Sequence, residues 1–370
     1  MIKRDLRVFD PMLELIADID GFAEFYYTRK LVEPGDFAIS MPLDGTGAES
    51  LTTGNFILVG DMTSRLGIIE EIEKKRLCKG TAWIIARGHE AKALLGRRIV
   101  LPAAGFERME MTAPAESVMK ALVATQCGLV AGEKRRIPGL VAVADEGRGM
   151  SYKISSRLTN LLTELCRCAR SSGLGFKLDF DDTGLALVFD VITGMDRSAE
   201  QSVNPRALIA EGYDTMKSAE IKTRSSGFSN TIYVEGKKSL ENWPMATVWN
   251  DLEPEGLNRF ERGLDAPLLQ NELELHEYGI GKLASYPEEF FLEAEVPNEA
   301  PVMPDEDYFL GDICSVEAYG QWYKVPLESI EERWTQDGPG IRLGFGRPAL
   351  GSHSTAMRET ESLWEMLRSG

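Results

Sequence analysis

The chain has 370 residues, of which 43% are hydrophobic, and it carries a formal net charge of −17 at pH 7. The hydrophobic content supports sizeable buried cores, which excludes a globally disordered chain. The negative charge argues against a general nucleic-acid binder, because such proteins need basic surface to displace counterions from phosphates.

The negative charge is concentrated in one part of the sequence. Residues 241–340 contain 23 acidic and 5 basic side chains, a net charge of −18, whereas the rest of the chain has a net charge of +1. We expect this region to repel DNA and anionic membranes and to attract basic partners or metal ions.

The five cysteines are odd in number, and their spacing forms no disulfide framework. They are Cys78, Cys127, Cys166, Cys168 and Cys314. This pattern fits reduced thiols. The N-terminus lacks the apolar core of a signal peptide, and no run approaches 18 apolar residues, so we expect no integral membrane segment.

Residues 1–112 are predicted to form a first strand-rich domain. Turns such as Asp20-Gly21 and Pro34-Gly35 separate short runs that alternate or are rich in aromatic residues. Strands are expected in residues 6–9, 13–16, 22–30, 37–40, 56–59, 66–72 and 81–86, with a short helix over 89–95. So many short strands at regular spacing predict a barrel or a sandwich.

Residues 113–195 change to an α+β pattern. One helix is expected to begin at Pro114 and continue through Val123. A second is expected over 155–172, with Ser155 as its N-cap and Gly173 as its stop. Two strands, 176–180 and 185–192, then flank a hairpin turn, so this segment reads as a compact inserted domain.

Residues 196–346 return to strands and form the third predicted domain. Strands are expected in residues 230–234, 290–296, 313–318, 322–330 and 341–345, with a helix over 267–283. Residues 347–370 read as a polar tail with one short amphipathic helix. The chain as a whole is therefore predicted to be a β-rich α+β protein.

A weak internal echo links the two strand-rich domains. Ile69-Glu70-Glu71 and Ile330-Glu331-Glu332 each follow an apolar stretch, and each lies after a Gly-Asp pair. A duplicated barrel would produce such an echo, and so would chance at this length.

One acidic segment approximates a calcium-binding loop. Asp179 and Asp181 precede Gly184, and Asp190 stands at the twelfth position. Thr183 at the fifth position, the short closing Asp and the strand-like flanks all differ from that motif, so a hairpin turn is the favoured interpretation. We therefore expect no metal site here.

Asp305-Glu306-Asp307 is a second carboxylate cluster. We expect it to be a solvated loop tip, with a site for a hard cation as the less favoured alternative. The three histidines lie far apart and lack zinc-site spacing. No phosphate-binding or nucleophile-elbow pattern stands at a strand-to-helix junction, so no cofactor and no catalytic residue is expected.

Several ordered motifs together resemble the siphophage tail baseplate hub family, whose members are related to the head domain of tail-associated lysins. The motifs are Arg4-x-x-Arg7-Val8-Phe9-Asp10, Tyr27-Thr28-Arg29, Glu33-Pro34-Gly35-Asp36-Phe37, Gly173-Leu174-Gly175-Phe176, Gly194-x-Asp196-Arg197-Ser198, Asn230-Thr231-x-Tyr233-Val234 and Arg259-x-Glu261. The resemblance as a whole spans residues 4–346.

The resemblance implies a fold of two tail-tube-like β-barrels with α/β insertions. The first barrel would comprise residues 1–112, completed by strands from 196–236, and the second would lie in 196–346. It also implies a homotrimer whose six barrels continue the six-fold tail tube.

The resemblance further implies a structural, non-enzymatic role in the virion tail tip, for a protein made in the host cytoplasm. The ring would contact the distal tail protein, the tape-measure protein and tip or receptor-binding proteins. DNA would pass through it on ejection without specific binding.

The chain departs from lysins, because the few residues after Gly346 are too short for an enzyme domain. The apolar residues of this tail, Leu363, Trp364, Met366 and Leu367, are candidates for docking another tip protein. An alternative is a carbohydrate- or peptidoglycan-active tail enzyme using Asp305, Asp307 or the Asp179/Asp181 pair, and another is a glycan-binding module.

Overall fold

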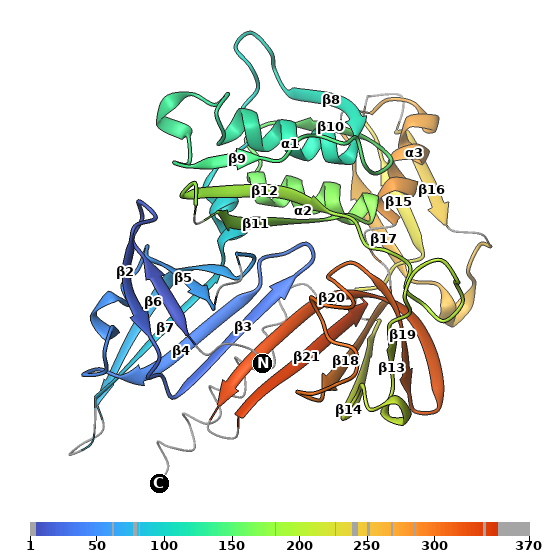
Figure 1. The fold of residues 1–370 in the computed structure, drawn as a ribbon. Helices are drawn as coiled ribbons and strands as arrows, with labels where there is room; N and C mark the ends of the chain where they lie inside the picture. Colours follow the sequence, from blue (N-terminus) through green and yellow to red (C-terminus); the bar gives the residue numbers. More distant parts are fainter. Residues whose placement is uncertain are drawn as a thin grey trace. The chain divides into compact units, whose positions relative to one another are not determined.

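A computed structural model shows the arrangement of the chain (Figure 1). It describes residues 5–60, 63–76, 80, 82–181, 183–225, 227–238, 243–249, 252–267, 269–283, 286, 288–335 and 338–346. The described chain divides into two compact units. The first contains the residues up to Glu220 together with Glu293–Phe345, and the second contains Ile221–Leu292.

The N-terminal part of the first unit is a run of seven strands with aromatic and β-branched residues at buried positions. They are β1 (Leu6–Phe9), β2 (Leu15–Ile19), β3 (Glu24–Lys30), β4 (Asp36–Pro42), β5 (Phe56–Val59), β6 (Leu66–Arg76) and β7 (Ala82–Glu90). Their order in the sheet is β3-β4-β7-β6-β5-β1-β2. The helix expected over 89–95 is a 3₁₀ helix, η2 (Ala91–Arg97).

The C-terminal strands extend the same sheet. They are β13 (Leu208–Ile209), β14 (Ser218–Arg224), β18 (Glu289–Val296), β19 (Ile313–Ala318), β20 (Gln321–Thr335) and β21 (Gly338–Gly346). The first half of β20 pairs with β19, and its second half lies between β21 and β3. The strand next to β3 is β20, and β13 and β14, from the range 196–236, belong to the same sheet.

The main path through this sheet runs from β14 at one end to β2 at the other. Among the described strands, no pairing joins these two ends into a closed barrel. The β-rich α+β class expected from the sequence is confirmed.

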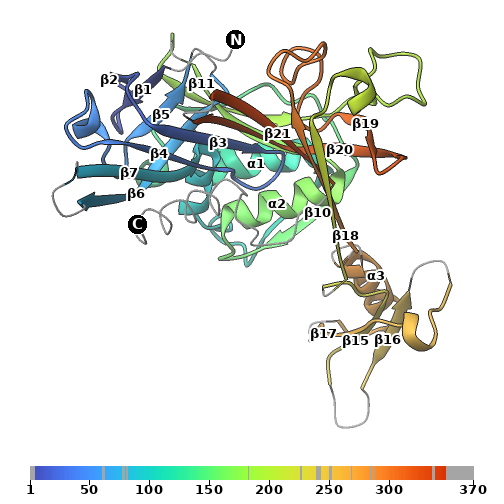
Figure 2. The ribbon, with the colours of Figure 1, turned by 90° about the horizontal axis from the view of Figure 1, so that it is seen from below.

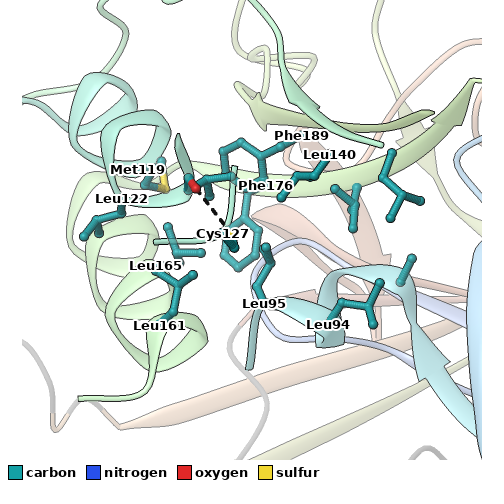
Figure 3. Packing of buried hydrophobic residues seen from close by; sticks show 14 of the residues in the cluster. Leu94, Leu95, Met119, Leu122, Cys127, Leu140, Leu161, Leu165, Phe176 and Phe189 are labelled. Atoms are coloured by element: carbon teal, nitrogen blue, oxygen red, sulfur yellow. Dashed lines mark hydrogen bonds between the residues drawn. The ribbon is translucent and has the colours of Figure 1, made fainter. Parts of the chain in front are cut away.

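The inserted α/β part packs two helices against two small sheets, β8-β10 and β9-β12-β11. The helices are α1 (Ala115–Gln126) and α2 (Leu161–Ser172), and the strands are β8 (Met109–Pro114), β9 (Leu140–Ala142), β10 (Ser151–Ser156), β11 (Gly175–Asp181) and β12 (Ala186–Ile192). Figure 3 shows apolar side chains from both helices, η2 and the three-stranded sheet β9-β12-β11, which meet in this core. Burial of these side chains holds the insertion together.

The start of α2 differs from the expected one. Residues 151–156 pair with β8 as a strand, and Leu158 has a left-handed backbone, φ 58°, which interrupts the chain before the helix. The N-cap is therefore Asn160, whose side chain accepts a hydrogen bond from the Thr163 amide, not Ser155. Gly173 ends the helix in the left-handed region, as predicted.

The second unit is a three-stranded sheet covered by one helix (Figure 2). It comprises β15 (Thr231–Glu235), β16 (Met245–Trp249), β17 (Glu261–Asp265) and α3 (Glu272–Leu283). Gly279 lies inside α3. A Cβ there would come within 2.7 Å of Val248, so this glycine permits close packing of the helix on the sheet. The remaining 3₁₀ turns are η1 (Ala48–Ser50), η3 (Glu133–Arg135), η4 (Glu211–Tyr213) and η5 (Gly256–Asn258).

In the described residues, no helix is both long and apolar enough to cross a membrane.

Candidate functional site

Four charged side chains meet where the N-terminal and C-terminal strands of the first unit join, and we call them the junction cluster. They are Arg29 on β3, Arg65 just before β6, Asp305 in the loop before β19, and Glu332 on β20. The exposed fraction of each side chain is 15% or less. Two cations therefore face two anions in a largely dry environment.

The geometry of the junction cluster is that of a closed network. Arg29 donates to both carboxylate oxygens of Asp305, with Nη1–Oδ1 2.9 Å and Nη2–Oδ2 2.6 Å. Arg65 Nη2 donates to Glu332 Oε1 at 2.6 Å and to Asp305 Oδ2 at 3.2 Å. A bidentate guanidinium–carboxylate pair has a strict geometry, so this network fixes the relative position of β3, β20 and the 305 loop.

Burial and ion pairing have opposite effects on the pKa values of Asp305 and Arg29. Burial disfavours ionisation of Asp305, but the charges of Arg29 and Arg65 and the hydrogen bond from Arg29 hold its pKa below the ordinary value. Burial likewise disfavours the Arg29 cation, but Asp305 and Glu332 raise its pKa above the ordinary value. Asp305 and Arg29 are therefore both charged at neutral pH.

Asp305 is thus not the solvated loop tip that we expected. Its backbone is left-handed, with φ 67°, and its amide donates to the Tyr308 carbonyl, which turns the carboxylate inward. Asp307, in the same loop, is exposed and accepts a hydrogen bond from the Met303 amide. The structure therefore separates the two carboxylates that the sequence grouped.

A second buried pair joins the segment after β12 to the start of β19. Arg197 Nε lies 2.6 Å from Asp312 Oδ2, and Asp312 also accepts from the amides of Met195 and Phe309. A Cβ on Gly194 would meet the Gly311 carbonyl oxygen at 1.8 Å, so the two chain segments can approach only through this glycine. The motif Gly194-x-Asp196-Arg197 therefore has a structural reason.

The calcium-like segment forms a hairpin turn between β11 and β12. Asp181 Oδ1 accepts hydrogen bonds from the amides of Thr183 and Gly184, which closes the turn. Asp179 pairs with Lys177 at 2.5 Å, and Asp190 pairs with Arg148 at 3.2 Å. Within the described ranges, no group of three or more His, Cys, Asp or Glu side chains could hold a metal ion.

Sequence reasoning missed the charge network on α1. Glu116 is fully buried and binds Lys120 Nζ at 2.6 Å and Arg148 Nη2 at 2.7 Å. The only sequence signal was an i,i+4 Glu–Lys pair, which usually marks an exposed helix face. The apolar tail residues Leu363, Trp364, Met366 and Leu367 lie outside the residues that the structure describes.

Comparison with protein families decides the identity of the chain. Residues 5–347 match the family model described as Siphovirus ReqiPepy6 Gp37-like protein. The chain belongs to this family. The resemblance to siphophage tail proteins expected from the sequence is thereby confirmed.

Solved structures similar to this Gp37-like chain include tail proteins from two bacteria. The 43 kDa tail protein of prophage MuSo2 from Shewanella oneidensis is 13% identical, with a TM-score of 0.59 over 93% of this chain and 98% of that chain. A tail protein from Neisseria meningitidis MC58 is 14% identical, with a TM-score of 0.57 over 92% of this chain and 96% of that chain. The Gp37-like chain therefore has the fold of these tail proteins. No curated protein sequence matches it significantly.

Proposed function

We propose that this Gp37-like protein is a structural component of the phage tail tip, the hub of the baseplate. Three copies would form a ring that continues the tail tube, connects the distal tail protein to tip or fibre proteins, and lets DNA pass during ejection. In this proposal, residues 1–112 and 196–346 supply the two tube-like halves, 113–195 is the inserted domain, and 347–370 is the tail.

The observation that carries this proposal is the junction between β3 and β20. Because β20 pairs with β3 and β21, strands from both ends of the sequence share one sheet, and the junction cluster clamps them together. Backbone pairing and buried charge pairs make a stiff wall. A stiff wall suits a ring that transmits force and needs no turnover.

The partners in this proposal are a homotrimer, the distal tail protein, the tape-measure protein, and tip or receptor-binding proteins in the virion. The acidic residues 241–340 support free passage of DNA, because like charges keep it from adhering.

The alternative of a carbohydrate-active enzyme receives less support from the candidate carboxylates. Asp305 accepts hydrogen bonds from two arginines, and Asp181 accepts one from the Thr183 amide in its own hairpin turn. A general acid needs a raised pKa, whereas the pKa of Asp305 is lowered.

The mass of the purified protein in solution, followed by negative-stain imaging of that peak, tests the hub. We expect a three-copy ring with a central hole wide enough for DNA. A monomer at every concentration, together with clearing of host cell walls in a zymogram that a variant at the exposed candidate carboxylate, Asp307→Asn, abolishes, would overturn the hub in favour of an enzyme.

We further propose that residues 347–370 dock a tip protein through Leu363, Trp364, Met366 and Leu367. Deleting 347–370 should leave the ring intact and stop tip assembly, as measured by imaging of rings mixed with purified tip protein. A ring that no longer forms would contradict this role.

A further inference from the structure

Beside the inserted α/β part, the first unit carries a face that is basic and apolar at once, and we call it the basic face. It consists of Arg97, Arg98, Ile99, Leu129, Val130, Lys134, Arg135 and Arg136. Hydrogen bonds hold these segments together, since Arg98 Nε donates to the Arg135 carbonyl and Arg136 Nε to the Ala131 carbonyl. A concentration of five cations is unusual in a chain with a net charge of −17.

The cations of the basic face have little negative charge to neutralise them. The guanidinium groups of Arg98, Arg135 and Arg136 bind backbone carbonyls and the Gln126 amide, and in the described part of the chain they have no carboxylate at ion-pair distance. Arg97 has one carboxylate neighbour, Glu70, at 3.4 Å. This face therefore presents a positive field that an anionic partner would neutralise.

The apolar part of the face points to a peptide as that partner. Leu129 and Val130 are 71% and 72% exposed. Arg97 and Arg98 of the basic face also line a cavity of about 200 Å³, together with Leu13, Phe56, Leu94 and Ile137. An apolar side chain would fill such a cavity while its acidic neighbours meet the arginines, and DNA offers no such side chain.

The second unit of the same chain carries a loop of matching chemistry, residues 252–257, which we call the acidic loop. Its leucines, Leu252 and Leu257, are 86% and 99% exposed and flank two glutamates. Arg259 braces the loop by binding Glu253 and the Pro254 carbonyl, so its shape is set before any contact. The loop lies in the most acidic stretch of the sequence.

We propose that the acidic loop of one copy docks on the basic face of the next copy, with a leucine in the cavity and Glu255 near Arg97. This inference rests on the proposed ring, because a cyclic assembly needs two different, complementary surfaces on each copy. Because the basic face and the acidic loop belong to the same chain and have opposite charge, we take the partner of the basic face to be a second copy. A leucine seated in the cavity would fix where along the face the loop binds.

The test uses the full-length protein as two populations with one added cysteine each, one with Val130→Cys and a tag, the other with Leu252→Cys. A short bis-maleimide should join the tagged and untagged chains in a mixture. Arg97→Glu in the tagged chain should lower the yield at least about fivefold, and Glu255→Arg in the other chain should restore it. Lys153→Glu, an exposed lysine on β10, is the matched control and should leave the yield unchanged.

The parent protein without added cysteines gives the background, because the native cysteines within the described ranges are buried. A yield that Arg97→Glu leaves unchanged, or that Glu255→Arg does not restore, overturns the contact. A three-copy mass without this cross-link overturns the contact and leaves the hub standing. The specific cross-link in a protein that forms no ring supports the contact and contradicts the hub. Binding of labelled duplex DNA that Arg97→Glu abolishes, with the cross-link unaffected, assigns the face to DNA instead.

Discussion

The tripeptide Ile-Glu-Glu occurs in two hairpins of the first unit, and its glutamates are exposed in one hairpin and buried in the other. In the β6–β7 hairpin, Glu70 and Glu71 follow Ile69 and have side chains 37% and 64% exposed. In the β20–β21 hairpin, Glu331 and Glu332 follow Ile330 and have side chains 7% and 2% exposed. Identical local sequence therefore does not set burial.

The difference comes from the number of neighbouring strands. β5 pairs with β6 only over Leu66–Ile68, so beyond Ile69 β6 has β7 on one side and, in the described pairings, no strand on the other. β20 has β21 on one side and β3 on the other. A charged glutamate that neighbouring strands bury needs a cation beside it, and Arg65 supplies it to Glu332.

The largest contrast should come from truncating the second glutamate of each tripeptide. Glu332→Ala leaves Arg65 buried with half its partners, so we expect the free energy of unfolding to fall by about 3–5 kcal/mol. Glu71→Ala removes an exposed partner of Arg87 and should cost less than about 1 kcal/mol. Urea unfolding of the two variants gives both values, and equal losses would contradict the comparison.

Aromatic packing at the β3–β20 seam should give the next largest effect. Trp334 is 3% exposed, and its ring lies 5.2 Å from that of Phe25 on β3. Trp334→Ala should cost about 3–5 kcal/mol by opening a cavity at the seam. The control is Trp322→Ala, since Trp322 is 51% exposed on the half of β20 that pairs with β19. If thermal unfolding shifts equally for both variants, the seam is not the stabilising contact.

The free energy of unfolding of variants at Asp305 and at Glu331 should depend on pH in opposite ways. The pKa of Asp305 is lowered in the folded state, so its contribution is present above its unfolded value, about 3.9, and is lost as the pH falls through the folded pKa. Asp305→Asn should therefore lose the most stability, relative to the parent, at neutral pH and little in strong acid.

Glu331 should behave in the opposite way. Burial raises its pKa although Arg333 pairs with it, so the cost of ionising it appears as the pH rises above its unfolded value, about 4.3. The stability of Glu331→Gln relative to the parent should therefore improve from pH 4 to pH 7. Urea unfolding across this range gives the slope, and parallel slopes for Glu331→Gln and Asp305→Asn would refute the assignment.

The smallest effect should come from the exposed glutamate of β6. Glu70 lies 2.7 Å from His89 and 3.4 Å from Arg97, in side chains that are partly exposed. Glu70→Gln should change the free energy of unfolding by less than about 0.5 kcal/mol, and salt should reduce even that. A larger, salt-independent loss would show that β6 is covered in solution, as β20 is.

Local patterns in the sequence were sufficient for most of the elements. Alternation and turn residues located the N-terminal strands, and Pro114 and Gly173 correctly marked one helix start and one helix end, because these signals act within a few residues. Ser155 failed as a cap because pairing with β8, a partner more than 40 residues away, drew it into a strand.

The candidate site depended on contacts that no local pattern encodes. Arg29 and Arg197 stood in the ordered motifs, but their partners Asp305 and Asp312 lie more than 100 residues away along the chain. Composition and motif order decided the protein family and the strand-rich class. The placement of β20 beside β3 decided which carboxylates are buried, because burial is a property of neighbours that only the folded sheet brings together.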